Sequence, residues 1–175
     1  MNTKNVSWQT PSINARSDRD LEGVGSVRTI GDRVYRWVKN ADASNAITFG
    51  QAAVAKASDG VNMFKYVYQT ITASLAWIAG IVMATDGLDA NTGTLPKIFG
   101  WIQVYGAQES VSVSGATTGG TDLTTGEYLK GVNAAGHLVR DGTTPTYRRT
   151  LIALTNVGTT TTPAAAYIPA YINCI

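Results

Sequence analysis

Charged residues are scarce in this chain of 175 residues, and histidine and cysteine occur once each. Charged side chains make up 15% of the sequence, against about a quarter in an average globular domain. His137 and Cys174 are too few for a usual zinc site, and a single cysteine excludes an intramolecular disulfide. The sequence therefore predicts one domain stabilised by packing, with no metal and no other cofactor.

Catalytic motifs are also missing. The chain has no G-x-S-x-G nucleophile elbow, and its Gly-rich stretch at 115–120 lacks the lysine of a phosphate-binding loop. His137, with Asp141 four residues on, is the one candidate general base. A lone histidine near a short strand is more often a surface or packing residue, so we expect no enzyme. A small hydrolase is the alternative, to be tested with His137→Ala.

No long apolar run is present. The longest, near residues 75–84, is interrupted by Gly80 and is too short to span a bilayer. Residues 1–10 lack the apolar region of a signal peptide. The net charge is +2, and acidic residues interleave with the basic ones near the N-terminus, so direct binding of nucleic acid is not favoured. We expect a soluble protein, made in a cytoplasm, that binds neither membrane nor nucleic acid.

Short segments of alternating apolar and polar residues, separated by Gly-containing turns, dominate the rest of the chain. This pattern predicts an all-β fold, a small β-barrel or β-sandwich spanning residues 27–175. Residues 71–79 fit either a short helix or a strand. Pro169 cannot donate to a ladder, so it predicts a sheet edge or a bulge. The clearest predicted strands are 33–39, 47–49, 52–55, 63–69, 80–84, 99–106, 110–114, 151–154 and 167–174.

Residues 1–26 are polar and of mixed charge, without an apolar period. They predict an extended N-terminal arm that docks on a neighbouring protein. Aromatic and arginine side chains most often carry interface energy. The expected partner-binding residues are therefore two apolar anchors and three partners for carboxylates: Trp8, Ile13, Arg16, Arg19 and Arg28. The rival interpretation is that the arm packs back on its own domain, with Trp8 covering one end.

One segment carries a resemblance to a known group of proteins. Residues 99–106 read FGWIQVYG, and this resembles a strand motif of small structural proteins of tailed bacteriophages. The lead-in AGIVMA at 79–84, the stretch 31–51 with VYRWVKN and ITFGQ, and the closing YINCI at 171–175 are similar to the same group. The resemblance covers roughly the middle half of the chain and does not extend to residues 1–26.

The resemblance implies a capsid decoration (cement) protein. Such a protein is located on the outer surface of a phage head, binds the major capsid protein, and stabilises contacts between capsomers as a homo-oligomer. It has no catalytic residues. The alternative is a head-fibre or tail-associated adhesin that binds cell-surface carbohydrate through Trp101 or Tyr105, which share one face of their predicted strand. A major capsid protein is not favoured, because the chain is short and lacks a long helix.

Overall fold

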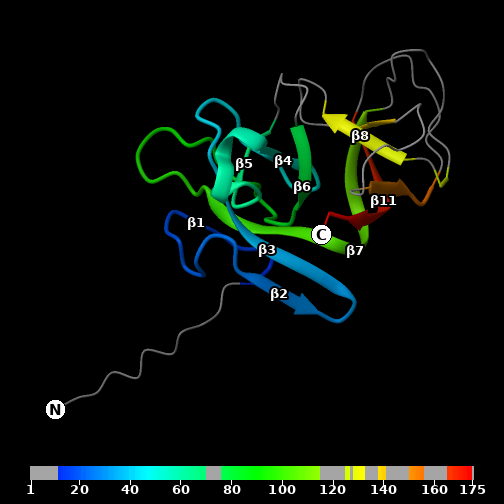
Figure 1. Cartoon of the computed structure of the whole chain (residues 1–175), viewed down its shortest axis with the longest axis horizontal. Coiled ribbons are helices and arrows are strands. Elements are labelled where there is room, and N and C mark those ends of the chain that lie inside the picture. The colour runs from blue at the N-terminus through cyan, green and yellow to red at the C-terminus, as the bar shows by residue number, and fades with distance from the viewer. Residues whose placement is uncertain are drawn as a thin grey trace.

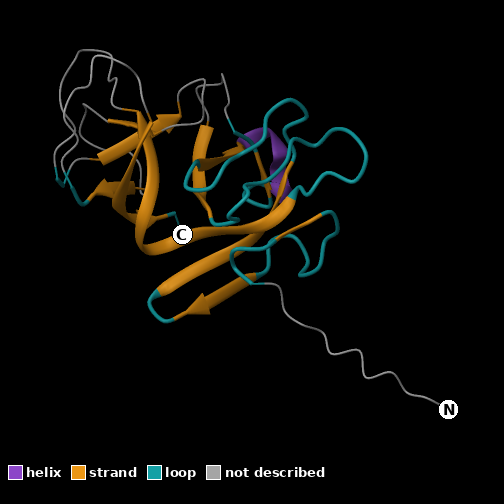
Figure 2. Cartoon of the chain, turned by 180° about the vertical axis from the view of Figure 1, so that it is seen from behind, coloured by secondary structure: helices purple, strands orange, loops and turns teal. Residues whose placement is uncertain are grey.

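The structure is a computed structural model that describes residues 12–69, 76–114, 125–126, 128–132, 138–140, 150–155 and 165–174. Strands make up nearly all of its regular structure, with one short 3-10 helix (Figure 2). The predicted all-β fold is therefore confirmed. The elements are β1 (Arg16–Ser17), β2 (Val27–Ile30), β3 (Arg33–Asn40), β4 (Ala52–Lys56), η1 (Ala57–Asn62), β5 (Tyr66–Val67), β6 (Ala76–Val82), β7 (Phe99–Ser114), β8 (Tyr128–Val132), β9 (Leu138–Arg140), β10 (Thr150–Ala153) and β11 (Ala165–Asn173).

One largely antiparallel sheet is organised around β7, a strand of 16 residues that curves through the molecule (Figure 1). Its first part pairs with β3 and β6, and its second part pairs with β11. Tyr105 lies at the change of partner, opposite Val34 of β3 and Asn173 of β11. The sheet is not closed, since β2 forms an edge. A barrel or sandwich is therefore not confirmed.

The bend in β7 depends on Gly106. Its φ is +98°, a conformation that residues with a side chain rarely adopt. The pattern predicts strands at 99–106 and 110–114 as separate elements, with Gly106 as a terminator. In the structure the strand continues, because β11 pairs with it from Tyr105 to Ser114. Glycine here permits a bend in a paired strand and does not end it.

Other predicted strands change in length for local reasons. Only Tyr66–Val67 of the predicted strand 63–69 is a strand, because Phe64 turns the chain with a φ of +66°. Residues 47–49 contribute a single bridge, Ile47 to Leu88. The ambiguous stretch 71–79 is a strand from Ala76 onward, and its earlier residues lie outside the described ones. The prediction for Pro169 is confirmed, since the register with β7 shifts between Ile168 and Ala170.

The central strands are buried on both faces. Ile102 and Val104 of β7 point into a large aliphatic cluster that includes Val38. Trp101, on the opposite face, belongs to an aromatic cluster completed by Tyr35, Trp37 and Met83. Trp37 lies directly opposite Trp101 in the ladder, and their rings form an edge-to-face pair with centroids 5.3 Å apart. A strand that is buried on both of its faces carries large apolar residues on each of them.

Replacement of Gly106 by alanine tests the bend. A Cβ at this position would lie 2.9 Å from the carbonyl oxygen of Asp32, in addition to the unfavourable φ. Gly93 is the control, because its φ is +83° and no atom lies within 4 Å of its added Cβ. We expect Gly93→Ala to cost about 1–2 kcal/mol and Gly106→Ala to cost a further 1–3 kcal/mol or so. Equal losses in denaturant titrations would show that the close approach to Asp32 has no effect.

Candidate interaction surface

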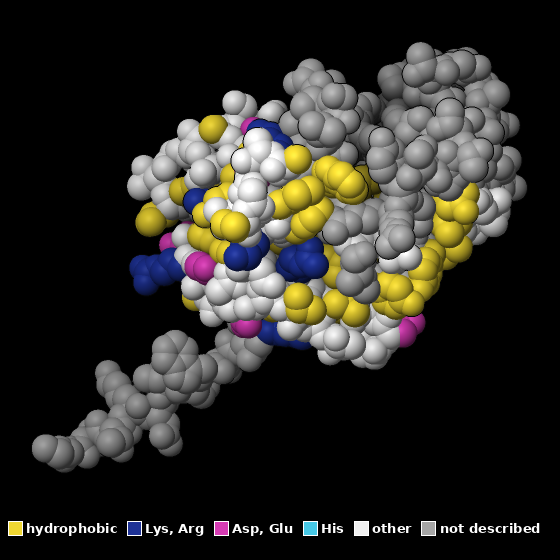
Figure 3. Space-filling view, viewed as in Figure 1, with side chains coloured by type: hydrophobic (Ala, Val, Ile, Leu, Met, Phe, Trp, Pro, Cys, Tyr) yellow, Lys and Arg dark blue, Asp and Glu magenta, His cyan; other side chains and the backbone are white. Residues whose placement is uncertain are grey.

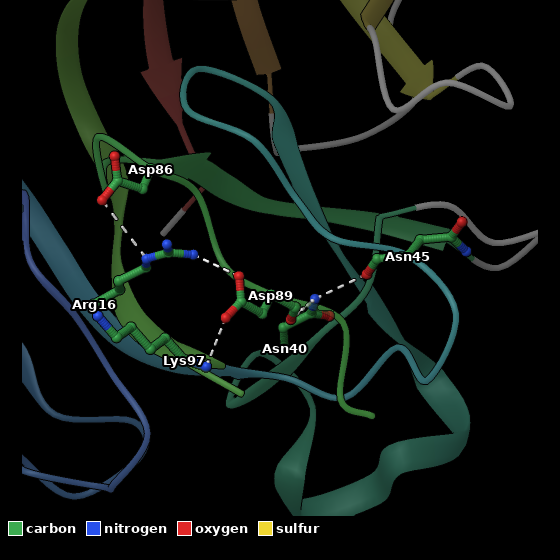
Figure 4. A network of polar contacts seen from close by, with 6 residues as sticks. All are labelled: Arg16, Asn40, Asn45, Asp86, Asp89 and Lys97. Atoms are coloured by element: carbon green, nitrogen blue, oxygen red, sulfur yellow. Dashed lines mark hydrogen bonds and ion pairs between the residues drawn. The ribbon is translucent and has the colours of Figure 1, made fainter. Parts of the chain in front are cut away.

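The described part of the predicted arm, residues 12–26, lies against the sheet. Arg16 is in β1, which pairs with the start of β7. Its Nη1 donates to Oδ1 of Asp89, and its Nε lies 3.8 Å from Oδ2 of Asp86 (Figure 4). Asp89 Oδ2 in turn accepts the backbone N–H of Lys97 at 2.8 Å. Arg16 therefore fastens the N-terminal segment to the loop between β6 and β7.

Asn40 extends this polar network into the interior. Its side chain is fully buried, and Nδ2 donates to the backbone oxygens of Asn45 at 3.0 Å and Asp89 at 2.8 Å. Its Oδ1 accepts the N–H of Asp42 at 3.1 Å. Each polar atom of this side chain thus has a protein partner. The arrangement joins β3 to two loops, and it leaves none of these atoms to hold a ligand.

Arg28 is also occupied within the chain. Its guanidinium carbon lies 4.4 Å from the centroid of the Trp101 ring, and its Nη2 lies 3.2 Å from Oε1 of Glu22. A cation over an indole face contributes roughly 0.5–2 kcal/mol, depending on desolvation. Arg28 and Glu22 therefore cover the aromatic cluster from the side of β2.

Asp20 holds the loop before β2 against the aromatic cluster. Its Oδ1 accepts the indole N–H of Trp37 at 2.9 Å and the backbone N–H of Gly23 at 2.9 Å. Its Oδ2 accepts the N–H of Val24 at 3.0 Å. Ile13 and Val24 pack on the aromatic cluster. Residues 12–26 are thus a layer over one face of the sheet, held by hydrogen bonds and apolar contacts.

The expected partner-binding residues therefore divide into three groups. Ile13, expected as an apolar anchor, and Arg16 and Arg28, expected as partners for carboxylates, make contacts inside the chain, and their binding to a neighbour stays a prediction. Arg19 is exposed over 82% of its side chain, with only a 4.0 Å approach to Asp18. Trp8 lies outside the described residues. The sequence could not reveal that the carboxylate for Arg16 lies 73 positions further along.

Of the two aromatic residues expected to bind sugar, Trp101 is buried and Tyr105 is half-buried. Trp101 is 1% exposed. Tyr105 is half-buried and packs edge-to-face on Tyr171, with ring centroids 5.6 Å apart. A hydrogen bond from the Tyr171 side chain to Tyr105 raises the pKa of Tyr171, and burial and the nearby charge of Asp32 add to this. A buried indole cannot stack on a sugar ring, so of the two expected residues only Tyr105 is placed to do so, and carbohydrate binding stays a prediction.

Exposed apolar residues along β2 were missed at the sequence level. Val27 is 58% exposed, Ile30 47% and Leu21, in the preceding loop, 57%. Hydrophobic side chains alternate with scattered charges over the face shown in Figure 3. The sequence does contain a pattern that predicts β2, because VRTI is followed by a Gly31-Asp32 turn and the alternating strand 33–39, as in a β-hairpin. We define the β2 edge as Val27, Arg28, Thr29 and Ile30.

No protein-family model, curated protein or solved structure matches this chain. Across the described ranges, no group of three or more His, Cys, Asp or Glu side chains is placed to hold a metal ion. None of the described helices is long and apolar enough to cross a membrane. His137 and Asp141, the candidate base and its neighbour, lie outside the described residues.

Asp20→Ala tests whether residues 12–26 stabilise the domain. The change leaves the buried Trp37 N–H and two backbone N–H groups without their acceptor, so we expect a loss of about 1–3 kcal/mol. Thermal and urea unfolding, followed by tryptophan fluorescence, measures it. Asp18→Ala is the matched control, because Asp18 makes only the 4.0 Å approach to Arg19. Equal stability of the two variants would contradict the role of Asp20.

Proposed function

We propose that this chain is a structural virion protein. It binds the major capsid protein on the outer surface of a phage head and stabilises contacts between capsomers. The supporting observation is that the motif FGWIQVYG, on which the resemblance rests, forms the first half of β7. This strand pairs with β1, β3, β6, β9 and β11. The resemblance therefore concerns the strand around which the sheet is organised and not a peripheral loop.

The surface of the domain supports a protein partner. Few residues are charged, and large apolar side chains are exposed at two separate places, Val61 in η1 (88%) and Leu95 in the loop between β6 and β7 (71%). Leu95 also has a φ of +55°. A residue with a side chain rarely adopts this conformation, and backbone strain of this kind is concentrated at functional sites. Exposed apolar side chains of this kind suit contact with a shell of protein.

The docking arm in this proposal is residues 1–11. Residues 12–26 are held on the sheet, so the arm begins from a fixed base at Ser12. Eleven residues can span at most about 36–40 Å, which is enough to cross from one subunit to a neighbour. The segment contains Val6 and Trp8 as large apolar residues. Tryptophan is among the residue types that most often dominate interface energy.

Repetition on a symmetric shell makes modest contacts effective. Every equivalent site on the head offers the same surface, and an arm tethered to a bound domain searches only a small volume. Each copy therefore adds to a network of linked subunits. The first test is composition: the protein should be present in purified virions of the phage that encodes it, at a fixed ratio to the major capsid protein. Absence from intact particles would overturn the proposal.

Deletion of residues 1–11 separates docking from folding. We expect the shortened protein to keep its melting temperature, because it retains Ile13, Asp20 and Val24, whose contacts hold the segment on the sheet. Its binding to particles stripped of this protein should weaken strongly. Trp8→Ala alone should cost about 2 kcal/mol of binding, or roughly 30-fold. Gln9→Ala is the matched control. Lost stability with unchanged binding would instead show that residues 1–11 pack on their own domain.

A further inference from the structure

The β2 edge is open. Among the described strands, β2 pairs with β3 and with no other. A strand at the edge of a sheet presents unpaired N–H and C=O groups, which can pair with another chain. Natural proteins commonly block such an edge with lysine, proline or an inward-pointing charge. The β2 edge has no lysine or proline, and its one charge, Arg28, is turned onto Trp101 and Glu22.

The hydrogen bonds of β3 show which residues of β2 face outward. Gly25 N–H donates to Trp37 O, and Trp37 N–H donates to Ser26 O, which is a bulge with Gly25 at a φ of +101°. In an antiparallel pair the bonded residues alternate. Ser26, Arg28 and Ile30 therefore bond to β3. Val27 and Thr29 point their N–H and C=O groups away from it.

We propose that two copies of this chain associate through their β2 edges, antiparallel across a two-fold axis at Thr29. This inference deepens the homo-oligomer part of the proposed function and does not require the shell. The occupant is a second copy because an isologous pairing needs only this strand. Val27 and Ile30, 58% and 47% exposed, supply the apolar side chains that would be covered.

Charges and hydrogen bonds together select the register. An axis at Ile30 would set Arg28 opposite Asp32, but Val27 would then face Arg33 of β3, and its outward N–H and C=O groups would stay unpaired. An axis at Arg28 would set the two Arg28 residues opposite each other, and like charges directly opposite are destabilising. An axis at Val27 would require the N–H of Gly25, which already bonds to Trp37. An axis at Thr29 avoids all three problems. It pairs Thr29 with Thr29, a favourable cross-strand pair, and sets Arg28 opposite Ile30.

The same register sets the Gly31–Asp32 turn of one copy near Ser26 and Arg28 of the other. Asp32 lies in the exposed turn that follows β2, and no described hydrogen bond or ion pair uses its carboxylate. The Arg28 guanidinium keeps its own contacts with Trp101 and Glu22, so Asp32 adds a long-range attraction and no direct ion pair. The charges that approach at each end are of opposite sign, and this favours the antiparallel pairing of two identical strands.

Cysteine cross-linking tests the register directly. Paired Thr29 residues would have Cα atoms about 5.5 Å apart, within the range that a disulfide spans. We expect Thr29→Cys to form a disulfide-linked dimer on mild oxidation. Val27→Cys, which is equally accessible, should not, because its two copies would lie about 13 Å apart along the strands. The natural Cys174 is fully buried and does not compete.

A second pair of variants measures association without a cross-link. Thr29→Pro removes an outward N–H and spares the bonds to β3, so it should abolish the concentration-dependent dimer in sedimentation velocity and leave the fold intact. Thr29→Val keeps the N–H and should still dimerise. A monomer at all concentrations, or equal cross-linking by Val27→Cys, would overturn the proposal. The proposal would also be overturned if Thr29→Cys formed a cross-link only after deletion of residues 1–11. In that case the chain's own arm, and not a second copy, would occupy the β2 edge.

These results are independent of binding to the shell. Loss of dimerisation in Thr29→Pro, with unchanged binding to stripped particles, would leave the proposed virion function standing. Dimerisation of a protein that is absent from virions would confirm the β2 edge and overturn the virion function. The two proposals therefore fail separately.

Discussion

The hydrogen bonds of the Gln103 side chain allow β7 to change partners halfway along its length. Gln103 is fully buried, and its Nε2 donates to the backbone oxygens of Tyr105 and Ala107, each at 3.1 Å. These two carbonyls flank Gly106, where the strand bends. A buried carbonyl without a donor costs about 1–3 kcal/mol, so the bend is tolerated because a side chain two positions earlier reaches both. The pairing with β11 runs from Tyr105 to Ser114, on the far side of this bend from β3.

The two buried faces of β7 also explain why the N-terminal segment packs on the sheet. Since β7 carries Ile102 on one face and Trp101 on the other, and both are buried, each face needs a cover. Strands β4 and β6 contribute to the aliphatic side. Residues 12–26 cover the aromatic side, through Ile13 and Val24 and through the bond from Trp37 to Asp20. Three charged residues of this segment, Arg16, Asp20 and Glu22, hold it on the sheet through contacts within the chain, whereas Arg19 is exposed.

Period-two patterning predicted the all-β class and β3 almost residue for residue, because side chains that alternate between two faces leave a direct trace in the sequence. It predicted a sheet edge or a bulge at Pro169, because proline lacks the N–H that a ladder needs, and the structure has the bulge. It did not predict the continuity of β7, because the consequence of glycine depends on whether a distant strand pairs beyond it. For the same reason, the sequence pattern did not predict that residues 12–26 cover one face of the sheet. A mixed-charge segment looks the same in sequence whether its partners lie on a neighbour or, like Asp89 for Arg16, far along the same chain.

Two surfaces with different energetics then remain available for association. A short edge strand offers a few directional hydrogen bonds whose net contribution is about 1 kcal/mol each, so it specifies geometry more than affinity. The arm proposed above, with Trp8 as its one large aromatic residue, would add affinity without fixing orientation. The β2 edge alone is therefore expected to give a weak, concentration-dependent dimer of the free protein. On the shell of the proposed function the domains would already be concentrated and aligned, and the same edge would pair at little further cost in entropy. The two proposals are thus consistent, because the edge specifies how two copies meet and a template would strengthen that pairing.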